Sequence, residues 1–185
     1  MANVVRILLL GKTGVGKSSF INYFLGKDVA AAGAGRPCTQ ELTKYVLNEW
    51  PDTSIELYDS KGLEVKDADN WTQDIAKELE EKSRLDFTER YHTIFYCISA
   101  QKKIESYEEK TLKELQKAAD QPIHVILTHC DDKTDDELEE RERCLKEKIS
   151  KTLCIYRITS IDKTKRGGAT IKKSGREEVV DGVFN

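Results

Sequence analysis

This chain of 185 residues has no long hydrophobic segment, because its longest apolar run, Val4 to Leu10, is interrupted by Arg6. A helix that crosses a bilayer needs about 20 mostly apolar residues, so the sequence excludes a membrane-spanning helix. The run also lacks a cleavage site of small residues, and we expect no signal peptide. Proline is scarce, with three residues, and there are eleven glycines, which excludes collagen-like and linker-like chains.

No charge of one sign dominates, because 30 Lys and Arg residues face 33 Asp and Glu residues for a net charge of -3. Such a balance provides no basic field that would hold nucleic acid or an anionic membrane. The hydrophobic share of 38% is too high for a disordered chain. We therefore expect a soluble protein with one domain over residues 1–185 and no strong nucleic-acid or membrane signal.

The cysteines are odd in number, and no two of them form a Cys-x-x-Cys unit. The three histidines are not placed to complete a zinc site with them. Free thiols are typical of a reducing compartment, so the sequence predicts a cytoplasmic protein. The five cysteines are Cys38, Cys97, Cys130, Cys144 and Cys154.

Short apolar runs that do not alternate cleanly are typical of parallel strands buried on both faces of a sheet. Helical patterns lie between these runs, which is the βαβ arrangement. Two further strands, residues 42–47 and 54–59, flank a turn-rich linker and predict an antiparallel hairpin. The expected fold is α/β, with three layers, a mostly parallel sheet containing one antiparallel hairpin strand, and helices on both faces. The four apolar runs are Val4–Leu10, Thr93–Ile98, Ile123–Leu127 and Leu153–Ile158.

The helical patterns repeat apolar residues about every 3.6 positions. One helix is expected after a cap at Asn70, and another after a capping box formed by Thr134 and Glu137. A short closing helix is expected over residues 175–184. The basic stretch 163–173 is interpreted as a solvated loop, with contact to RNA or an anionic membrane as the alternative.

The segment from Gly11 to Ser18 matches the phosphate-loop pattern G-x-x-x-x-G-K-S/T at every fixed position. Its glycines let the backbone turn tightly, so that successive N–H groups point at phosphate oxygens. The N-terminus of the following helix adds partial positive charge. Lys17 is expected to reach the β- and γ-phosphates and the Ser18 hydroxyl to ligate Mg²⁺. The expected contacts to the phosphates come from Thr13, Gly14, Val15, Gly16, Lys17, Ser18 and Ser19.

The residues from Gly11 to Asn22 resemble the phosphate loop of the translation-factor-related small GTPases, most closely that of their Era/septin-like branch. Asp59 and Gly62 match the D-x-x-G motif of this class at the end of the second hairpin strand. The resemblance implies a P-loop G domain in which Asp59 reaches Mg²⁺ through a water and the Gly62 N–H contacts the γ-phosphate. It also implies that Thr39 ligates Mg²⁺ only when the γ-phosphate is present.

The family's base motif, N/T-K-x-D, corresponds here to Thr128, His129, Cys130 and Asp131. A carboxylate at Asp131 that accepts from guanine N1–H and N2–H₂ would favour GTP over ATP, because adenine offers neither donor. His129 replaces a lysine, so we expect guanine selectivity to survive and affinity to fall. An ordinary strand end is the alternative interpretation. The last family motif falls at Ser160, whose backbone is expected near the base.

Leu63 stands where many GTPases place the glutamine that orients the attacking water. A leucine cannot position water, so we expect slow hydrolysis by the chain alone. Three sources of the missing group stay open: a partner or second copy, Glu64, and Arg36. Arg36 lies three residues before Thr39, the offset at which G-protein α subunits carry an arginine finger, and a solvated arginine is its alternative interpretation.

Together these features predict a protein that binds GTP, hydrolyses it to GDP and phosphate with Mg²⁺, and acts as a nucleotide-dependent molecular switch. The alternative is a nucleotide-binding scaffold with negligible turnover, which Leu63 favours. The expected partners are a guanine nucleotide, a second copy in a nucleotide-dependent homodimer, and an effector protein that the sequence does not identify. The family often carries an effector domain, so a piece of a longer chain is a further interpretation.

Overall fold

The structure is a computed structural model that describes residues 3–30, 42–50, 52–164, 168 and 170–184. At its centre is a six-stranded sheet with the order β2-β3-β1-β4-β5-β6. Every neighbouring pair is parallel except β2 and β3, which confirms the predicted sheet with one antiparallel hairpin strand. The strands are β1 (Asn3–Gly11), β2 (Thr43–Trp50), β3 (Thr53–Asp59), β4 (Thr93–Ser99), β5 (Ile123–Thr128) and β6 (Cys154–Arg157).

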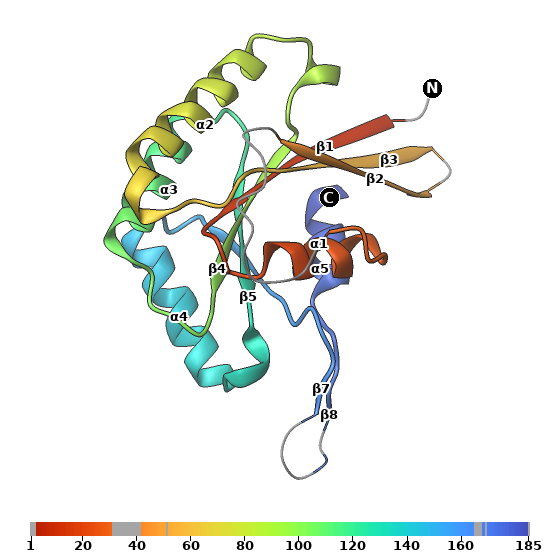
Figure 1. Ribbon diagram of the computed structural model, residues 1–185, viewed down its shortest axis with the longest axis vertical. Coiled ribbons are helices and arrows are strands. Elements are labelled where there is room, and N and C mark those ends of the chain that lie inside the picture. The colour runs from red at the N-terminus through yellow and green to blue at the C-terminus, as the bar shows by residue number, and fades with distance from the viewer. Residues whose placement is uncertain (1–2, 31–41, 51, 165–167, 169, 185) are drawn as a thin grey trace.

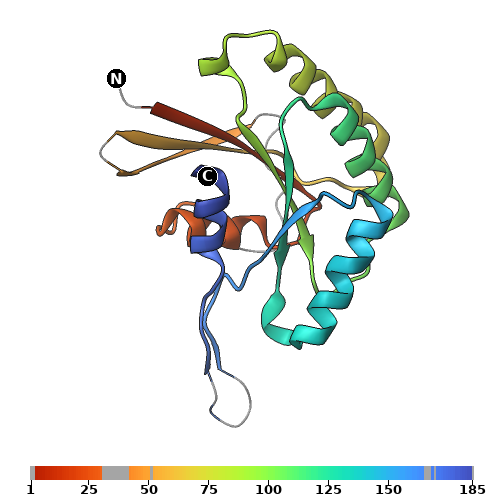
Figure 2. The same ribbon diagram turned by 180° about the vertical axis from the view of Figure 1, so that it is seen from behind.

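Helices cover both faces of the sheet, as the sequence predicts (Figure 1). α1 and α5 lie together on one face, α2, α3 and α4 cover the other, and the view from behind shows the same layers (Figure 2). Within the ranges that the structure describes, no helix is both long and apolar enough to cross a membrane. The helices are α1 (Lys17–Leu25), α2 (Ala68–Ser83), α3 (Ser106–Ala118), α4 (Asp135–Lys148) and α5 (Arg176–Phe184).

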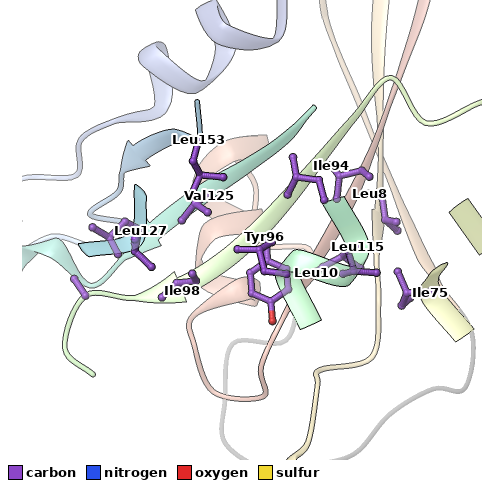
Figure 3. Packing of buried hydrophobic residues seen from close by; sticks show 14 of the residues in the cluster. Leu8, Leu10, Ile75, Ile94, Tyr96, Ile98, Leu115, Val125, Leu127 and Leu153 are labelled. Atoms are coloured by element: carbon purple, nitrogen blue, oxygen red, sulfur yellow. The ribbon is translucent and has the colours of Figure 1, made fainter. Parts of the chain in front are cut away.

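The central strand β1 shows why its apolar run does not alternate with polar residues. Successive side chains of a strand point to opposite faces, and both faces of this sheet are covered. Ile7 and Leu9 belong to the core that includes Phe20 of α1. Leu8 and Leu10 belong to the opposite core, together with residues of α2 and α3 (Figure 3). The loop that follows β1 therefore starts from a strand that is fixed between two cores.

The two predicted helix starts have different outcomes. The capping box of α4 is present, because Glu137 N–H donates to Thr134 Oγ1 at 3.3 Å and Thr134 N–H donates to Glu137 Oε2 at 2.9 Å. The predicted cap at Asn70 is wrong, because α2 begins at Ala68. A 3₁₀ turn, Val65–Asp67, leads directly into this helix, so the incoming backbone rather than a side-chain cap sets the start.

The basic stretch that was expected as a loop contains a two-stranded ribbon. β7 (Lys163–Thr164) pairs antiparallel with β8 (Thr170–Ile171), and the ribbon projects away from the sheet (Figure 1). Its base is fastened by two backbone hydrogen bonds between Thr159 and Ser174, at 3.2 and 3.0 Å. These bonds fix the place from which Lys163 leaves the body of the protein.

Candidate functional site

The loop between β1 and α1 bends through glycines whose backbone lies in the left-handed region. Gly14 has φ 79° and Gly16 has φ 93°, a conformation that residues with a Cβ avoid. Gly16 directly precedes α1 and has no side chain that could cap the helix. The first N–H groups of α1 therefore lack a side-chain cap, as an anion site at a helix N-terminus requires.

Two groups of opposite charge lie close to this loop. Lys17 Nζ donates to the carbonyl of Gly11 at 3.2 Å, so the side chain folds back across the loop. Asp59 ends β3, the neighbour of β1. Burial raises the pKa of the Asp59 carboxyl to about 6, and the positive charge of Lys17 opposes that rise. Asp59 Oδ1 is buried and has no hydrogen-bond partner among the described residues.

The unpartnered oxygen of Asp59 is the feature that fits a divalent cation. A buried carboxylate oxygen without a partner is unfavourable, and Mg²⁺ prefers oxygen ligands. The second predicted ligand, Ser18, lies in the first turn of α1 and is partly buried. The third, Thr39, lies outside the described residues, as does Arg36. The part of the predicted set that the structure describes is therefore compatible with Mg²⁺.

The D-x-x-G segment lies along the phosphate loop. Leu63 N–H donates to the Gly11 carbonyl at 3.0 Å, and Thr13 N–H donates to the Leu63 carbonyl at 3.1 Å. A Cβ added to Gly62 would lie 2.4 Å from Thr13 Oγ1 and 2.9 Å from Thr13 Cα, so only glycine fits. Leu63 itself is fully buried. Backbone pairing thus brings the two motifs together, which their separation in the sequence does not show.

The base-motif residues after β5 contact the same loop. The Thr128 hydroxyl donates to the carbonyl of Val15, and its oxygen lies 3.3 Å from the carbonyl of Ile98. His129 has a left-handed backbone with φ 56°, which is uncommon for a residue with a side chain. Its imidazole lies against Gly16, where an added Cβ would be 3.0 Å from Nε2. Histidine therefore braces the loop without the ammonium of the family's lysine.

Asp131 is covered rather than open. Its side chain is 7% exposed, and its Oδ2 accepts a hydrogen bond from Lys163 Nζ at 3.0 Å. Lys163 also forms an ion pair with Asp132. The sequence did not identify Lys163, because it lies in the ribbon that was expected as a solvated loop. The carboxylate predicted to bind the base is thus paired with a cation of the same chain.

Ser160 follows β6 and lies beside the start of α1. It lines a cavity of about 550 Å³ together with Ser19 and Asn22 of α1 and Arg176 of α5. The structure therefore brings two predicted nucleotide-binding residues, Ser19 and Ser160, to the same cavity, although they lie 141 positions apart in the sequence. Arg176 Nε donates to the carbonyl of Phe24 at 2.8 Å and holds α5 against α1.

The phosphate loop also contacts α3 through Lys12, for which no motif predicts a role. The ammonium forms an ion pair with Glu105, the residue before α3, and lies 5.4 Å from the centroid of the Tyr107 ring. Hydrogen bonds to Glu105 and Tyr107 raise the pKa of Lys12. This pair links the loop to a helix on the far side of the sheet from α1.

Comparisons with known proteins agree with this arrangement. Residues 6–129 match the family described as 50S ribosome-binding GTPase. GTPase Der from Campylobacter hominis is 29% identical over 132 residues, which make up 71% of this chain and 27% of Der. The chain therefore spans about a quarter of the length of this relative.

Solved structures share the fold at lower identity. A variant of Era from Aquifex aeolicus bound to GDP and AlF4- has a TM-score of 0.73 at 20% identity, over 98% of this chain and 56% of that chain. Toc33 from Arabidopsis thaliana in complex with Mg²⁺ and GMPPNP has a TM-score of 0.72 at 15% identity, over 98% of this chain and 83% of that chain. At these identities the likeness shows the fold alone, and it confirms the predicted G-domain architecture.

Proposed function

Because this chain belongs to the 50S ribosome-binding GTPase family, we propose that it binds GTP and GDP with Mg²⁺, hydrolyses GTP slowly and acts as a nucleotide-dependent molecular switch. Membership of a GTPase family supports GTP binding and hydrolysis in general. The metal ion, the slow rate and the switch are the finer parts of the proposal, together with an effector protein that distinguishes the two nucleotide states.

The observation that carries the proposal is the buried, unpartnered Oδ1 of Asp59 beside the phosphate loop. Ser18 directly and Asp59 through a water would hold Mg²⁺, which supplies positive charge to the β- and γ-phosphate oxygens. Lys17 would exchange the Gly11 carbonyl for these oxygens, because a hydrogen bond to a charged acceptor is stronger than one to a carbonyl. The loop N–H groups would bind the remaining oxygens.

Hydrolysis needs a water in line with the γ-phosphate, and its catalysis consists of positioning and charge stabilisation. The Gly62 N–H would donate to the γ-phosphate, which is absent from GDP. Leu63 follows Gly62 and is hydrogen-bonded through its backbone to Gly11 and Thr13. A backbone movement of Gly62 on loss of the γ-phosphate would therefore alter these hydrogen bonds. The buried apolar side chain of Leu63 offers no group to a water, which supports slow turnover.

On the base side, Asp131 would accept from guanine N1–H and N2–H₂, with the Ser160 backbone beside the base. Thr128 and His129 would hold the phosphate loop against this site through Val15 and Gly16. Adenine would leave the carboxylate without a donor, and such losses discriminate strongly.

Competition among GTP, GDP and ATP for a fluorescent guanine nucleotide tests the proposal, with and without a Mg²⁺ chelator. We expect GTP and GDP to compete, ATP to compete far less, and chelation to weaken GTP. Equal competition by ATP would contradict the base assignment. A GTP affinity that is insensitive to chelation would contradict the metal assignment.

A nucleotide-dependent scaffold with negligible turnover is the second candidate, favoured by the complete burial of Leu63. For the first candidate, an active GTPase, we propose a homodimer in which a second copy supplies the group that orients the attacking water. For chloroplast atToc33 and psToc159, one solved structure is described as showing that dimerization is important for GTPase activity.

Phosphate release at rising protein concentration separates the two candidates. An enzyme activated by a second copy should turn over faster per molecule as concentration rises, and a group supplied in trans can be worth about 10³–10⁵ in rate. Arg36→Ala should slow turnover at every concentration if Arg36 acts in cis, and should remove only the concentration dependence if it acts in trans. Low turnover strictly proportional to protein, and equal in Arg36→Ala, would favour the scaffold.

We also propose a cytoplasmic location. The cysteines in the described ranges, Cys97, Cys130, Cys144 and Cys154, are free thiols, and burial raises the pKa of Cys97 to about 12. Unpaired thiols are typical of a reducing compartment. Imaging of a fluorescent fusion of the full-length protein tests the location.

A further inference from the structure

We propose that Lys163 is an internal competitor of guanine: its ammonium occupies Asp131 in the nucleotide-free protein, and the base must displace it. The proposal rests on the proposed function, since it takes Asp131 as the acceptor of the base. It adds a specificity-determining residue that lies outside the family motifs, on the ribbon formed by β7 and β8.

The first observation is the cover over Asp131. The carboxylate is 7% exposed, and Lys163 Nζ lies 3.0 Å from its Oδ2. The Lys163 side chain is 42% exposed, so the ammonium is the more accessible member of this pair. A base that uses both oxygens of Asp131 must therefore compete with the ammonium for Oδ2.

The second observation is that the ammonium has another anion to keep. Lys163 Nζ is also paired with Asp132, whose side chain is 37% exposed. When the base takes Asp131, the lysine can retain Asp132 and remain solvated. Displacement therefore costs only part of the electrostatic interaction, which suits a reversible competitor.

The third observation is that Lys163 is held at this place by the ribbon. Lys163 is paired with Ile171 in the ribbon ladder. Asp162 Oδ1 accepts the N–H of Lys173 at 2.8 Å and closes the base of the ribbon. Because the backbone on both sides is fixed, the ammonium has a high effective concentration at Asp131.

The chemistry of two bases turns this arrangement into a test. Guanine presents N1–H and N2–H₂, so GDP uses both oxygens of Asp131 and must displace Lys163. Hypoxanthine has N1–H but no 2-amino group, so IDP leaves one oxygen to the lysine. The competitor should therefore weaken GDP and leave IDP unaffected.

Lys163→Met keeps the aliphatic stem and removes the charge. We expect it to tighten GDP by about fivefold at low salt, the scale of a partly exposed ion pair that limits the competent fraction, and to leave the affinity for IDP unchanged. Lys163→Arg should keep the wild-type ratio of the two affinities. Lys172→Met removes the lysine that directly follows β8 and is paired with Asp162 at 3.2 Å, and it should change neither affinity.

The wild-type protein provides an independent measurement by calorimetry. Salt screens an exposed ion pair, so the preference for GDP over IDP should widen as salt rises in wild type and stay constant in Lys163→Met. Weaker GDP binding by Lys163→Met would overturn the proposal, because Lys163 would then hold the bound base. If Lys163→Met changes the affinities for GDP and IDP equally, or changes neither, the proposal is wrong, and the ion pair only stabilises the position of the ribbon. If wild type binds neither nucleotide, the proposed function itself has failed.

Discussion

The phosphate side and the base side of this site are held together by different kinds of contact. On the phosphate side, backbone groups of Leu63 pair with Gly11 and Thr13, so these contacts use no side-chain atoms. On the base side, the contacts are made by side chains, and one of them is the ion pair that joins the half-exposed Lys163 to the buried carboxylate of Asp131. In the proposed function, backbone pairing would give a preformed phosphate site, whereas the base site would have to rearrange because a side-chain ion pair covers it.

This difference explains where the chain departs from its family pattern. The phosphate loop keeps every fixed position, because glycine conformations and N–H directions have no substitute. The base motif has His129 in place of lysine, and its Asp131 is paired with Lys163 of the ribbon. A side-chain contact can be supplied by a residue of another segment. A left-handed backbone conformation favours glycine at its own position in the chain, and no other segment can supply it.

Lys17→Ala is the change with the largest expected effect, because it removes the charge from the preformed side. We expect GTP and GDP affinity to fall by about a hundredfold or more, since hydrogen bonds to charged phosphate oxygens are among the strong ones. Lys77→Ala on α2 removes an exposed lysine and is the matched control. Retention of wild-type affinity in Lys17→Ala, measured by calorimetry, would show that the phosphates bind elsewhere.

Asp131→Asn changes the residue proposed to bind the base. It should lower GTP affinity by about tenfold or more, a smaller loss than that expected for Lys17→Ala. The amide replaces an acceptor by a donor, so the variant should admit xanthosine triphosphate, whose base carries a carbonyl in place of the 2-amino group. Asp132→Asn changes the neighbouring carboxylate and should keep the preference for GTP. Unchanged GTP affinity in Asp131→Asn would place base recognition outside this motif.

Asp59→Asn separates stability from function on the phosphate side. Burial raises the pKa of Asp59 to about 6, so the folded protein keeps an unfavourable charge at neutral pH when no cation is bound. We expect the variant without nucleotide to gain about 1–2 kcal/mol in the free energy of unfolding and to lose the Mg²⁺ dependence of GTP binding. Chemical denaturation in a chelator measures the first effect. A less stable variant would mean that the carboxylate has a structural partner.

The smallest expected effect concerns β5, the strand that leads into the base motif. Burial lowers the pKa of His124, whose ring stacks on Tyr156 at 5.6 Å between centroids. The folded state holds the ring neutral, so its contribution to stability is present above the ordinary pKa of about 6.5 and is lost as pH falls, because the unfolded chain takes up the proton first.

His124→Phe keeps an aromatic ring against Tyr156. The variant should lose less unfolding free energy than wild type when the pH is lowered from neutral to mildly acidic. His92, whose pKa burial also lowers, contributes in the same direction, so a His92→Phe variant shows the remaining part. Asp59, whose pKa is raised to about 6, contributes in the opposite direction over this range, so each variant is compared with wild type at every pH. A stability difference between His124→Phe and wild type that does not vary with pH would contradict the assignment of His124, and the same holds for His92→Phe.

The sequence predicted the parts of the fold that local patterns encode. Apolar runs that alternate with helical patterns predicted the parallel sheet, and the turn-rich linker between residues 42–47 and 54–59 predicted its one antiparallel strand. Thr134 with Glu137 predicted the start of α4. The cap at Asn70 was wrong because the chain enters α2 from a preceding 3₁₀ turn. The ribbon was missed because strands of two residues have no periodicity to detect.

The sequence by itself determined the phosphate loop, because glycine spacing fixes backbone directions over a few residues. Only the tertiary structure decided how the site is closed. The pairing of Leu63 with Gly11, the contact of His129 with Gly16 and the ion pair of Lys163 with Asp131 join segments far apart in the chain. Such contacts depend on where the sheet places each loop, and no local pattern of residues records that position.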